Sequence, residues 1–192
     1  TPYFTSGAVI TPGSGVTMGT ALTCAATAGL GVVTYEWTNN GSVVGSGNNL
    51  TVSSSNSTIG STLICTATAT GSTGLTAVST DSVQIDNRVP IASAAISPSS
   101  NITTGTTLTC NGSVSDPDDG PLTPNYTWYV DNNNTGVTTS SFTTSASNTN
   151  VGSSVYCVLS GTDSNGASTQ ANSNTVSIIN TVGSVNNVDI PW

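Results

Sequence analysis

Apolar and polar residues alternate along most of this chain in short runs, and Gly or Asn interrupts the runs at intervals of roughly eight to twelve residues. The runs 22–26, 33–37 and 63–67 each place their apolar residues on one side. Alternation with period two is typical of a strand that has one buried face. No segment keeps apolar residues at helical spacing over three turns. The pattern therefore predicts an all-β fold built from many short strands.

The chain also repeats itself. The hexapeptide Gly-Thr-Ala-Leu-Thr-Cys at 19–24 recurs as Gly-Thr-Thr-Leu-Thr-Cys at 105–110, and a Tyr-x-Trp motif and a second cysteine follow in the same order in both copies. Such self-similarity predicts two domains of one fold, residues 1–88 and 89–182. Residues 183–192 are then a C-terminal tail, the start of a further repeat or a docking strand.

Each copy carries two cysteines and a tryptophan between them. The set is Cys24, Trp37 and Cys65 in the first copy and Cys110, Trp128 and Cys157 in the second. In an immunoglobulin-type sandwich the two cysteines bridge the sheets and the tryptophan packs on the bridge. Four cysteines can pair in three ways, and the repeat favours one pair within each copy, with four free buried thiols as the alternative. We expect two tandem immunoglobulin-like β-sandwiches, each with one inter-sheet disulfide.

The second copy resembles the tandem immunoglobulin-like or PKD-like repeats of large secreted prokaryotic surface proteins. The resemblance rests on a Thr-Cys strand end, a Ser-Asp-Pro-Asp loop, a Tyr-x-Trp strand and a Cys-to-Gly hairpin, which are residues 109–110, 115–122, 126–128 and 157–166. It implies an extracellular stalk, adhesin or filament component, and it supplies no catalytic residues. Disulfides point to the same oxidising location, the cell surface or the extracellular space.

The composition excludes several functions. The 192 residues include nine Asp or Glu but only one cation, Arg88, and no His, so the net charge is −8. A chain without a basic surface does not neutralise phosphates, which argues against nucleic-acid binding. Without histidine there is no histidine base and no histidine-ligated metal. No apolar run reaches the length of a membrane span, so membrane insertion is not expected. We expect no enzyme.

Acidic residues gather around one predicted loop of the second copy. Three lie in that loop, a fourth lies in the following hairpin and a fifth leaves the first copy: Asp116, Asp118, Asp119, Asp163 and Asp86. Two interpretations remain open. Hard oxygen donors of this kind are Ca²⁺ ligands, and bound calcium would stiffen the junction between the copies. Alternatively, Asp-Pro-Asp-Asp-Gly is a turn chosen for its backbone preferences, with Arg88 as a weak counter-charge. Calcium is the one cofactor that the sequence raises.

Asparagine occurs in two further motifs. Seven sequons, Asn-x-Ser/Thr, occur at Asn40, Asn49, Asn56, Asn101, Asn111, Asn125 and Asn133. That number is about what chance gives in a chain so rich in Ser and Thr, so these are glycosylation candidates only. The Asn-Gly pairs at 40–41 and 165–166 predict tight hairpin turns, with binding-loop tips as the alternative.

The sequence favours a non-enzymatic extracellular structural module, a stalk or filament subunit of a cell-surface assembly. The partners would be other copies of the chain or neighbouring repeats. The alternative is an adhesin that binds a glycan or a partner protein through its end loops. The aromatic residues Tyr3, Phe4 and Trp192 near the two ends are either docking elements for a neighbouring subunit or parts of the repeats themselves.

Overall fold

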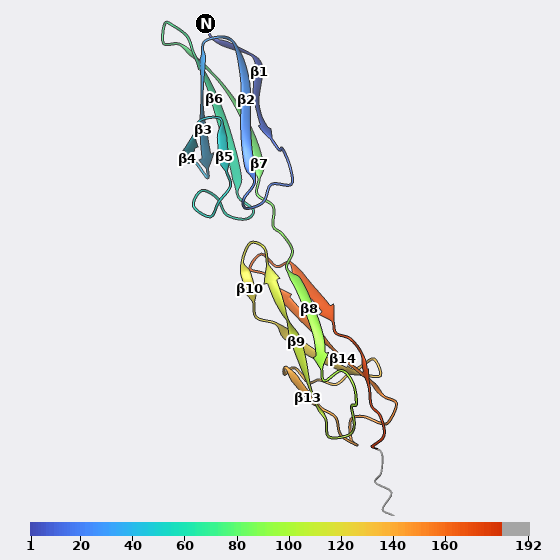
Figure 1. Cartoon of the computed structure of the whole chain (residues 1–192). Helices are drawn as coiled ribbons and strands as arrows, with labels where there is room; N and C mark the ends of the chain where they lie inside the picture. Colours follow the sequence, from blue (N-terminus) through green and yellow to red (C-terminus); the bar gives the residue numbers. More distant parts are fainter. Residues whose placement is uncertain (182–192) are drawn as a thin grey trace, which may run out of the picture. The chain divides into compact units, whose positions relative to one another are not determined.

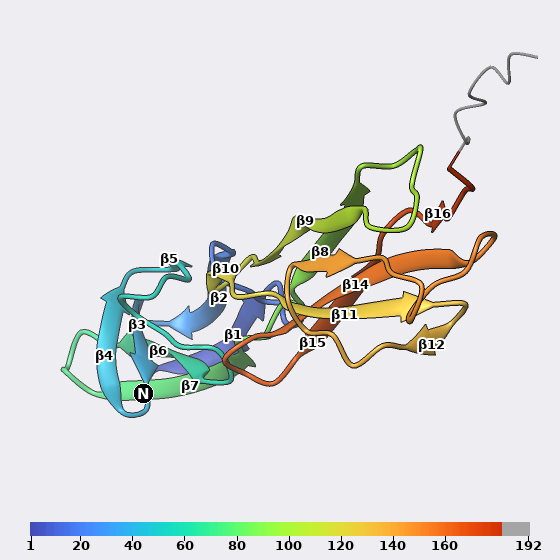
Figure 2. The ribbon, with the colours of Figure 1, turned by 90° about the horizontal axis from the view of Figure 1, so that it is seen from below.

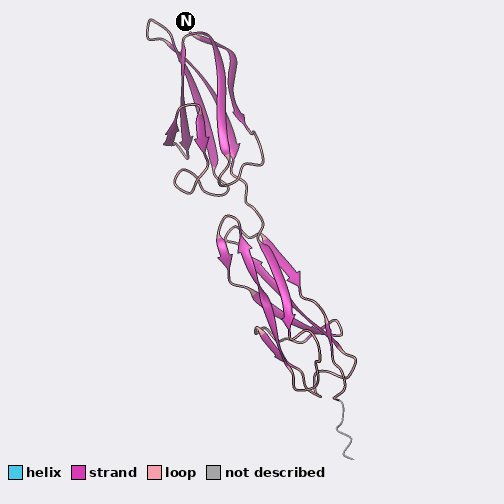
Figure 3. Cartoon of the chain, viewed as in Figure 1, coloured by secondary structure: helices cyan, strands magenta, loops and turns pink. Residues whose placement is uncertain are grey.

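The computed structural model describes residues 1–181, which consist of strands, turns and loops without a helix (Figure 3). None of these residues belongs to a helix long and apolar enough to cross a membrane. Contacts divide the chain into two units, Thr1–Arg88 and Val89–Trp192.

Unit 1 consists of two antiparallel sheets (Figure 1). One sheet has the order β1-β2-β5 and the other has the order β4-β3-β6-β7. The strands are β1 (Tyr3–Thr11), β2 (Ala21–Leu30), β3 (Val32–Asn39), β4 (Ser42–Ser46), β5 (Asn49–Thr51), β6 (Thr62–Thr70) and β7 (Thr76–Gln84). The strands form because their apolar residues alternate with Thr and Ser, so one face of each strand can be buried while the other meets water.

The core of unit 1 lies between its two sheets. Leu22 and Cys24 on β2 face Leu63 and Cys65 on β6, and all four side chains are buried. The turn from β3 to β4 is the tight hairpin that Asn40 and Gly41 predict, since φ is 49° and 81° at these two residues. Positive φ at both central positions is the mark of a type I′ turn, which matches the twist of the strands it joins.

Unit 2 repeats the arrangement (Figure 2), and its central strands β9 and β14 are as long as β2 and β6 in unit 1. In one sheet β9 pairs with β8, β10 and β13, and the other has the order β12-β11-β14-β15, with β16 also paired to β14. The strands are β8 (Ile91–Ser97), β9 (Thr107–Asp116), β10 (Gly120–Leu122), β11 (Asn125–Val130), β12 (Asn133–Asn134), β13 (Ser141–Thr143), β14 (Ser154–Thr162), β15 (Ser168–Asn172) and β16 (Val176–Ser177).

The hairpin between β14 and β15 is longer than its Asn-Gly pair predicts. The last paired residues are Thr162 and Ser168, so five residues connect the strands. Gly166 has φ of 90°, and the side chain of Asp163 caps the turn by accepting the backbone N–H groups of Asn165 and Ala167 at 2.9 and 2.8 Å. A capped loop has replaced the two-residue turn because a carboxylate can satisfy N–H groups that no strand partner reaches.

Both units are immunoglobulin-like β-sandwiches, because two antiparallel sheets enclose a core in each and one disulfide joins the sheets. The bridges are Cys24–Cys65, with Cα atoms 6.5 Å apart, and Cys110–Cys157, with Cα atoms 6.1 Å apart. The described part of the chain has no free cysteine. The sequence-based prediction of fold and pairing is thus confirmed.

Candidate functional site

A tryptophan lies beside each disulfide, in the centre of its unit. Trp37 and Trp128 are fully buried, and in the sheets they pair directly with Cys65 and Cys157. Each indole N–H still finds an acceptor: Trp37 Nε1 donates to the carbonyl of Gly47 at 3.0 Å, and Trp128 Nε1 donates to that of Thr139 at 2.9 Å. A buried indole N–H without such an acceptor would lose its hydrogen bond to water and gain none in return. The bridge and the indole therefore form one rigid centre per unit.

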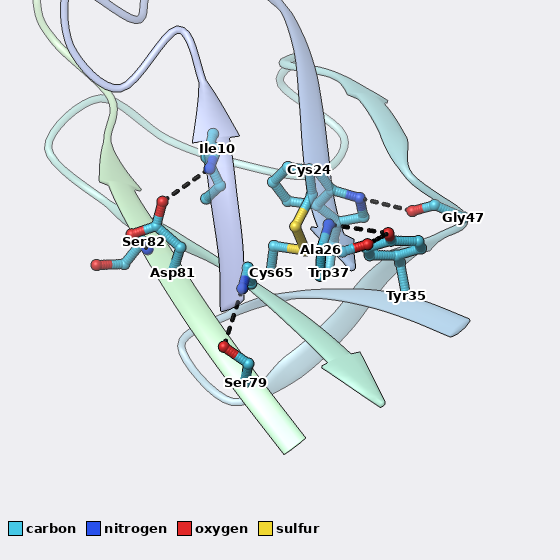
Figure 4. Close-up of a disulfide and its surroundings, with 11 residues drawn as sticks. Ile10, Cys24, Ala26, Tyr35, Trp37, Gly47, Cys65, Ser79, Asp81 and Ser82 are labelled. Carbon is cyan, nitrogen blue, oxygen red and sulfur yellow. Dashed lines mark hydrogen bonds between the residues drawn. A yellow bond between two sulfur atoms is a disulfide. The ribbon is translucent and has the colours of Figure 1, made fainter. Parts of the chain in front are cut away.

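A tyrosine makes a second connection between the sheets of unit 1 (Figure 4). The hydroxyl of Tyr35 on β3 accepts the N–H of Ala26 at 3.1 Å and donates to the carbonyl of the same residue at 3.2 Å. Ala26 lies on β2, two residues beyond Cys24. The two peptide groups that flank Ala26 are therefore both held by a side chain from the opposite sheet, next to the sulfur bridge.

The first and last strands of unit 1 are joined by side chains rather than by a backbone ladder. On its inner edge β1 pairs with β2, so the N–H groups of Ala8 and Ile10 point the other way, toward β7. The hydroxyl of Ser79 accepts the N–H of Ala8 at 2.9 Å, and Asp81 Oδ2 accepts that of Ile10 at 2.7 Å (Figure 4). Asp81 Oδ1 also accepts the N–H of Ser82 at 2.9 Å. We call the Ser79–Ala8 and Asp81–Ile10 contacts the β1–β7 latch.

Unit 2 holds its first strand in a related way, with a neutral acceptor. The N–H of Ile96 on β8 donates to Asn174 Oδ1 at 2.8 Å. Asn174 lies in a short break between β15 and β16, where Ser173 Oγ accepts the N–H of Cys157 at 3.0 Å. Ile96 pairs with Cys110 just as Ile10 pairs with Cys24. The same position of the repeat is therefore latched by a carboxylate in unit 1 and by a carboxamide in unit 2.

Beyond the latches, each unit closes with a parallel contact between its first and last segments. Val16 bridges Ile85 in unit 1, and Ile102 bridges Ile178 in unit 2. The N–H of Asp86 donates to the carbonyl of Val16 at 2.6 Å, and that of Ile179 donates to Ile102 at 2.7 Å. In each unit the chain enters at one end and leaves at the opposite end (Figure 1). A pull on the two ends therefore shears these contacts along the strands.

The acidic loop of unit 2 is built as a turn. Asp116, which is 2% exposed, accepts the N–H groups of Asp118 and Asp119 on Oδ1 at 2.7 and 2.8 Å. Asp119 Oδ2 accepts the N–H of Ser164 at 2.9 Å, which joins this loop to the β14–β15 hairpin. Asp116 Oδ2 is buried without a hydrogen bond. The carboxylates of Asp116 and Asp119 thus accept hydrogen bonds from backbone N–H groups of the loops, as the turn interpretation expects.

The calcium interpretation stays a prediction. Among the described residues no three His, Cys, Asp or Glu side chains gather closely enough to hold a metal ion. Asp86 belongs to unit 1, at the parallel contact with Val16. Calcium binding at this loop predicts a rise in Tm on adding the ion, because a ligand that binds only the folded state stabilises it. An unchanged Tm at millimolar calcium would contradict it.

The sequons differ in how free their asparagine side chains are. Six are exposed: Asn40, Asn49, Asn101, Asn111, Asn125 and Asn133. Asn56 is half-buried, since its Nδ2 donates to the carbonyl of Thr51 at 2.8 Å and its Oδ1 accepts the N–H of Ser53 at 2.9 Å. A glycan on Asn56 would break this loop, so we expect it to stay unmodified. Whether the others carry sugars remains a prediction from sequence.

The N-terminal aromatic residues belong to their own unit. Tyr3 pairs with Leu30 and Phe4 with Ala28 in the β1–β2 ladder, and Phe4 packs against the core. Phe4 is therefore part of the core of unit 1, whereas Tyr3 keeps 55% of its surface exposed. Trp192 and the tail 183–192 lie outside the described residues.

The latch residues escaped the sequence analysis, although a signal existed. Along β7 the inward positions are Ala77, Ser79, Asp81 and Val83. Polar residues at two positions that should meet the core indicate that they serve a partner there. Their partner is the outer edge of β1, which only the folded chain reveals.

Comparison with known proteins finds similar solved structures at low identity. No family model and no curated protein match the chain. Similar solved structures include three N-terminal domains of the bacteriophage RB49 outer capsid protein Hoc, with 15% identity and a TM-score of 0.36 over 92% of this chain. Sidekick-1 immunoglobulin domains 1–5 share 19% identity with a TM-score of 0.35, again over 92% of this chain.

A third similar structure is that of the fibronectin(III)-like modules of Clostridium thermocellum CbhA, with 14% identity, a TM-score of 0.34, and 93% and 94% of the two chains covered. The chain spans 59% of the Hoc structure and 38% of the Sidekick-1 structure. Immunoglobulin-like and fibronectin type III domains share the sandwich architecture without needing similar sequences. The strand order and the two sulfur bridges define the class of this chain, a tandem pair of immunoglobulin-like domains.

Proposed function

We propose that this chain is a non-enzymatic extracellular structural module that bears tension, as part of a stalk or filament on a cell surface. The observation that carries the proposal is the connection between the first and last strand of each unit. In unit 1 the β1–β7 latch and the Val16–Ile85 contact lie between the two points where the chain enters and leaves. Tension along the chain must therefore break several contacts together before the unit opens.

The disulfides support the same role. They close loops with sequence separations of 41 and 47 residues. A unit that opens under tension can release only the residues outside its loop, so its extension is limited while the bridge is intact. Disulfides also persist chiefly in oxidising surroundings, in keeping with the proposed location outside the cell. The partners would be other copies of the chain or neighbouring units.

Single-molecule force spectroscopy tests the proposal, with handles at the two ends of the full chain. We expect two unfolding events, one for each unit. Reduction of the disulfides should lengthen them by the residues in the loops, about 140 Å and about 160 Å at the length of an extended residue. Asp81→Ala should lower the unfolding force of unit 1, because the N–H of Ile10 loses its acceptor.

Val52→Ala is the matched control. Val52 is buried in the core of unit 1 but lies on neither β1 nor β7. This change should lower the free energy of unfolding while affecting the force much less than Asp81→Ala does. An unfolding force that Asp81→Ala leaves unaltered, or that both variants lower equally, would contradict a role of the latch in bearing tension.

A further inference from the structure

One end of unit 1 exposes a group of large apolar side chains. Tyr3, Leu30, Val32 and Leu75 are 55%, 54%, 73% and 54% exposed, and we call these four residues the end patch. They lie where the chain enters the unit and where turns join β2 to β3 and β6 to β7 (Figure 1). A cleft of about 510 Å³ lies beside them, lined by Leu30, Gly31, Val32, Thr70, Gly71 and Ser72.

The backbone that carries the end patch is held by hydrogen-bonded ladders and a closed turn. Tyr3 pairs with Leu30 in the β1–β2 ladder, and Val32 pairs with Thr70 in the β3–β6 ladder. The turn that carries Leu75 is closed by a hydrogen bond from the N–H of Gly71 to the carbonyl of Leu75 at 2.9 Å. The ring of Tyr3 occupies the space beside Gly29 that a Cβ would otherwise need. Such a preordered surface loses little entropy when it binds.

The end patch is also uncharged. The acidic residues of unit 1 are Glu36 in the middle of β3, Asp81 in the latch and Asp86 after β7. The equivalent end of unit 2 carries the acidic loop instead. Two copies with a net charge of −8 each repel one another, and they repel least where one of them offers no charge. Exposed apolar groups of this kind are typical of interaction sites.

We propose that the end patch binds residues 188–192 of a second copy, an inference that rests on the proposed structural function. The segment reads Val-Asp-Ile-Pro-Trp, with apolar residues at 188, 190 and 192 and a single acid. Proline favours an extended backbone before it, and tryptophan is a frequent anchor residue in interfaces. The eleven residues after 181 reach up to about 40 Å when extended, enough to cross the cleft. The contact joins unlike surfaces, so it propagates copies head to tail.

Sedimentation velocity of the full chain at rising concentration tests this proposal. The native chain should associate in steps, whereas Leu30→Asp and Trp192→Ala should each weaken association at least about tenfold. Val78→Asp is the control, since Val78 is 60% exposed on β7 and lies outside the end patch; it should associate like the native chain. Circular dichroism and thermal unfolding verify that every variant is folded, as expected for changes at exposed positions.

Mixing the two inactive variants is the decisive step. Trp192→Ala keeps its end patch and Leu30→Asp keeps its tail, so an equimolar mixture should form dimers and nothing larger. Association of Trp192→Ala alone, loss of association in Val78→Asp, or a mixture that stays monomeric would each overturn the proposal, as would a native chain that remains monomeric. These outcomes leave the force measurement untouched, so failure of the tail contact and failure of the tension-bearing role are distinguishable.

Discussion

Removal of the carboxylate of Asp81 is the sharpest test of how unit 1 is held together. In Asp81→Ala the N–H of Ile10 loses a 2.7 Å hydrogen bond to a charged acceptor and stays partly buried. Hydrogen bonds to charged groups contribute about 1.5–3 kcal/mol, and an unpaired buried N–H carries a similar penalty. We therefore expect unit 1 to lose about 2 kcal/mol. For a domain of this size that corresponds to a fall in Tm of roughly 8–16 °C.

The companion variant Asp81→Asn separates acceptor from charge. A carboxamide oxygen serves the same N–H in unit 2, where Asn174 Oδ1 lies 2.8 Å from the nitrogen of Ile96. The Asn variant should therefore lose less stability than the Ala variant. Its single carboxamide oxygen can keep the bond from Ile10, but the charge assistance and the exposed bond from the N–H of Ser82 are lost.

Urea unfolding followed by NMR, with amide signals resolved for each unit, measures both variants against the native chain. Unit 2 should be unaffected within about 0.5 kcal/mol, since distant sites act independently. Amide hydrogen exchange at Ile10 should accelerate in Asp81→Ala before exchange in the centre of β6 does. If the Asn variant proves as unstable as the Ala variant, or if Asp81→Ala changes stability by less than about 0.5 kcal/mol, the latch does not work as argued.

Three further predictions test unit 2, one of them with a control variant in unit 1. Hydrogen bonds from the backbone N–H of Ser154 and then from the hydroxyl of Ser153 lower the pKa of Asp131. The ionised Asp131 side chain therefore stabilises unit 2 above the pKa that this residue has in the unfolded chain, and this contribution is lost as the pH falls through the lower pKa of the folded state. Asp131→Asn should make the urea midpoint of unit 2 less dependent on pH below about pH 4. Gly112→Ala should destabilise unit 2 by more than about 2 kcal/mol, because a Cβ there would lie 1.9 Å from the carbonyl oxygen of Ser93. Gly13→Ala is the control. The nearest atom to its Cβ would be 3.6 Å away, so this variant should leave Tm unchanged. Replacement of both Cys110 and Cys157 by Ala should remove roughly 4 kcal/mol by the chain-entropy relation, measurable as a lower urea midpoint for unit 2 alone.

The fold was largely predictable from sequence because its signals are local and repeated. The alternation around Cys24 and Cys65 identifies strands with one buried face, and the second copy repeats the pattern around Cys110 and Cys157. The same order of motifs in both copies, with the two cysteines 41 and 47 residues apart, favours one pair within each copy. The burial of Trp37 and Trp128 follows from their parity with those cysteines.

The contacts between strands distant in sequence were not predictable in the same way. Whether Asp81 contacts Ile10 depends on the position of β1 relative to β7. Among residues 1–181 the backbone ladder of β1 is formed with β2, so no ladder sets that position. The Asn165-Gly166 pair suggested a two-residue turn, but Asp163 caps a longer loop. In both cases a side chain satisfies backbone groups of a segment whose position depends on the whole sandwich, and periodicity holds no information about such partners.

The separation of entrance and exit in each sandwich has a consequence for how genes encoding such chains can grow. The first and last segments of each unit are in parallel contact, so the chain enters at one end of the unit and leaves at the other. A further copy can therefore be added after the last segment without disturbing the core of an existing unit. The length of such a polypeptide can then change by whole copies. Each copy remains free to diverge at its surface, as the carboxylate and carboxamide acceptors of the two units already illustrate.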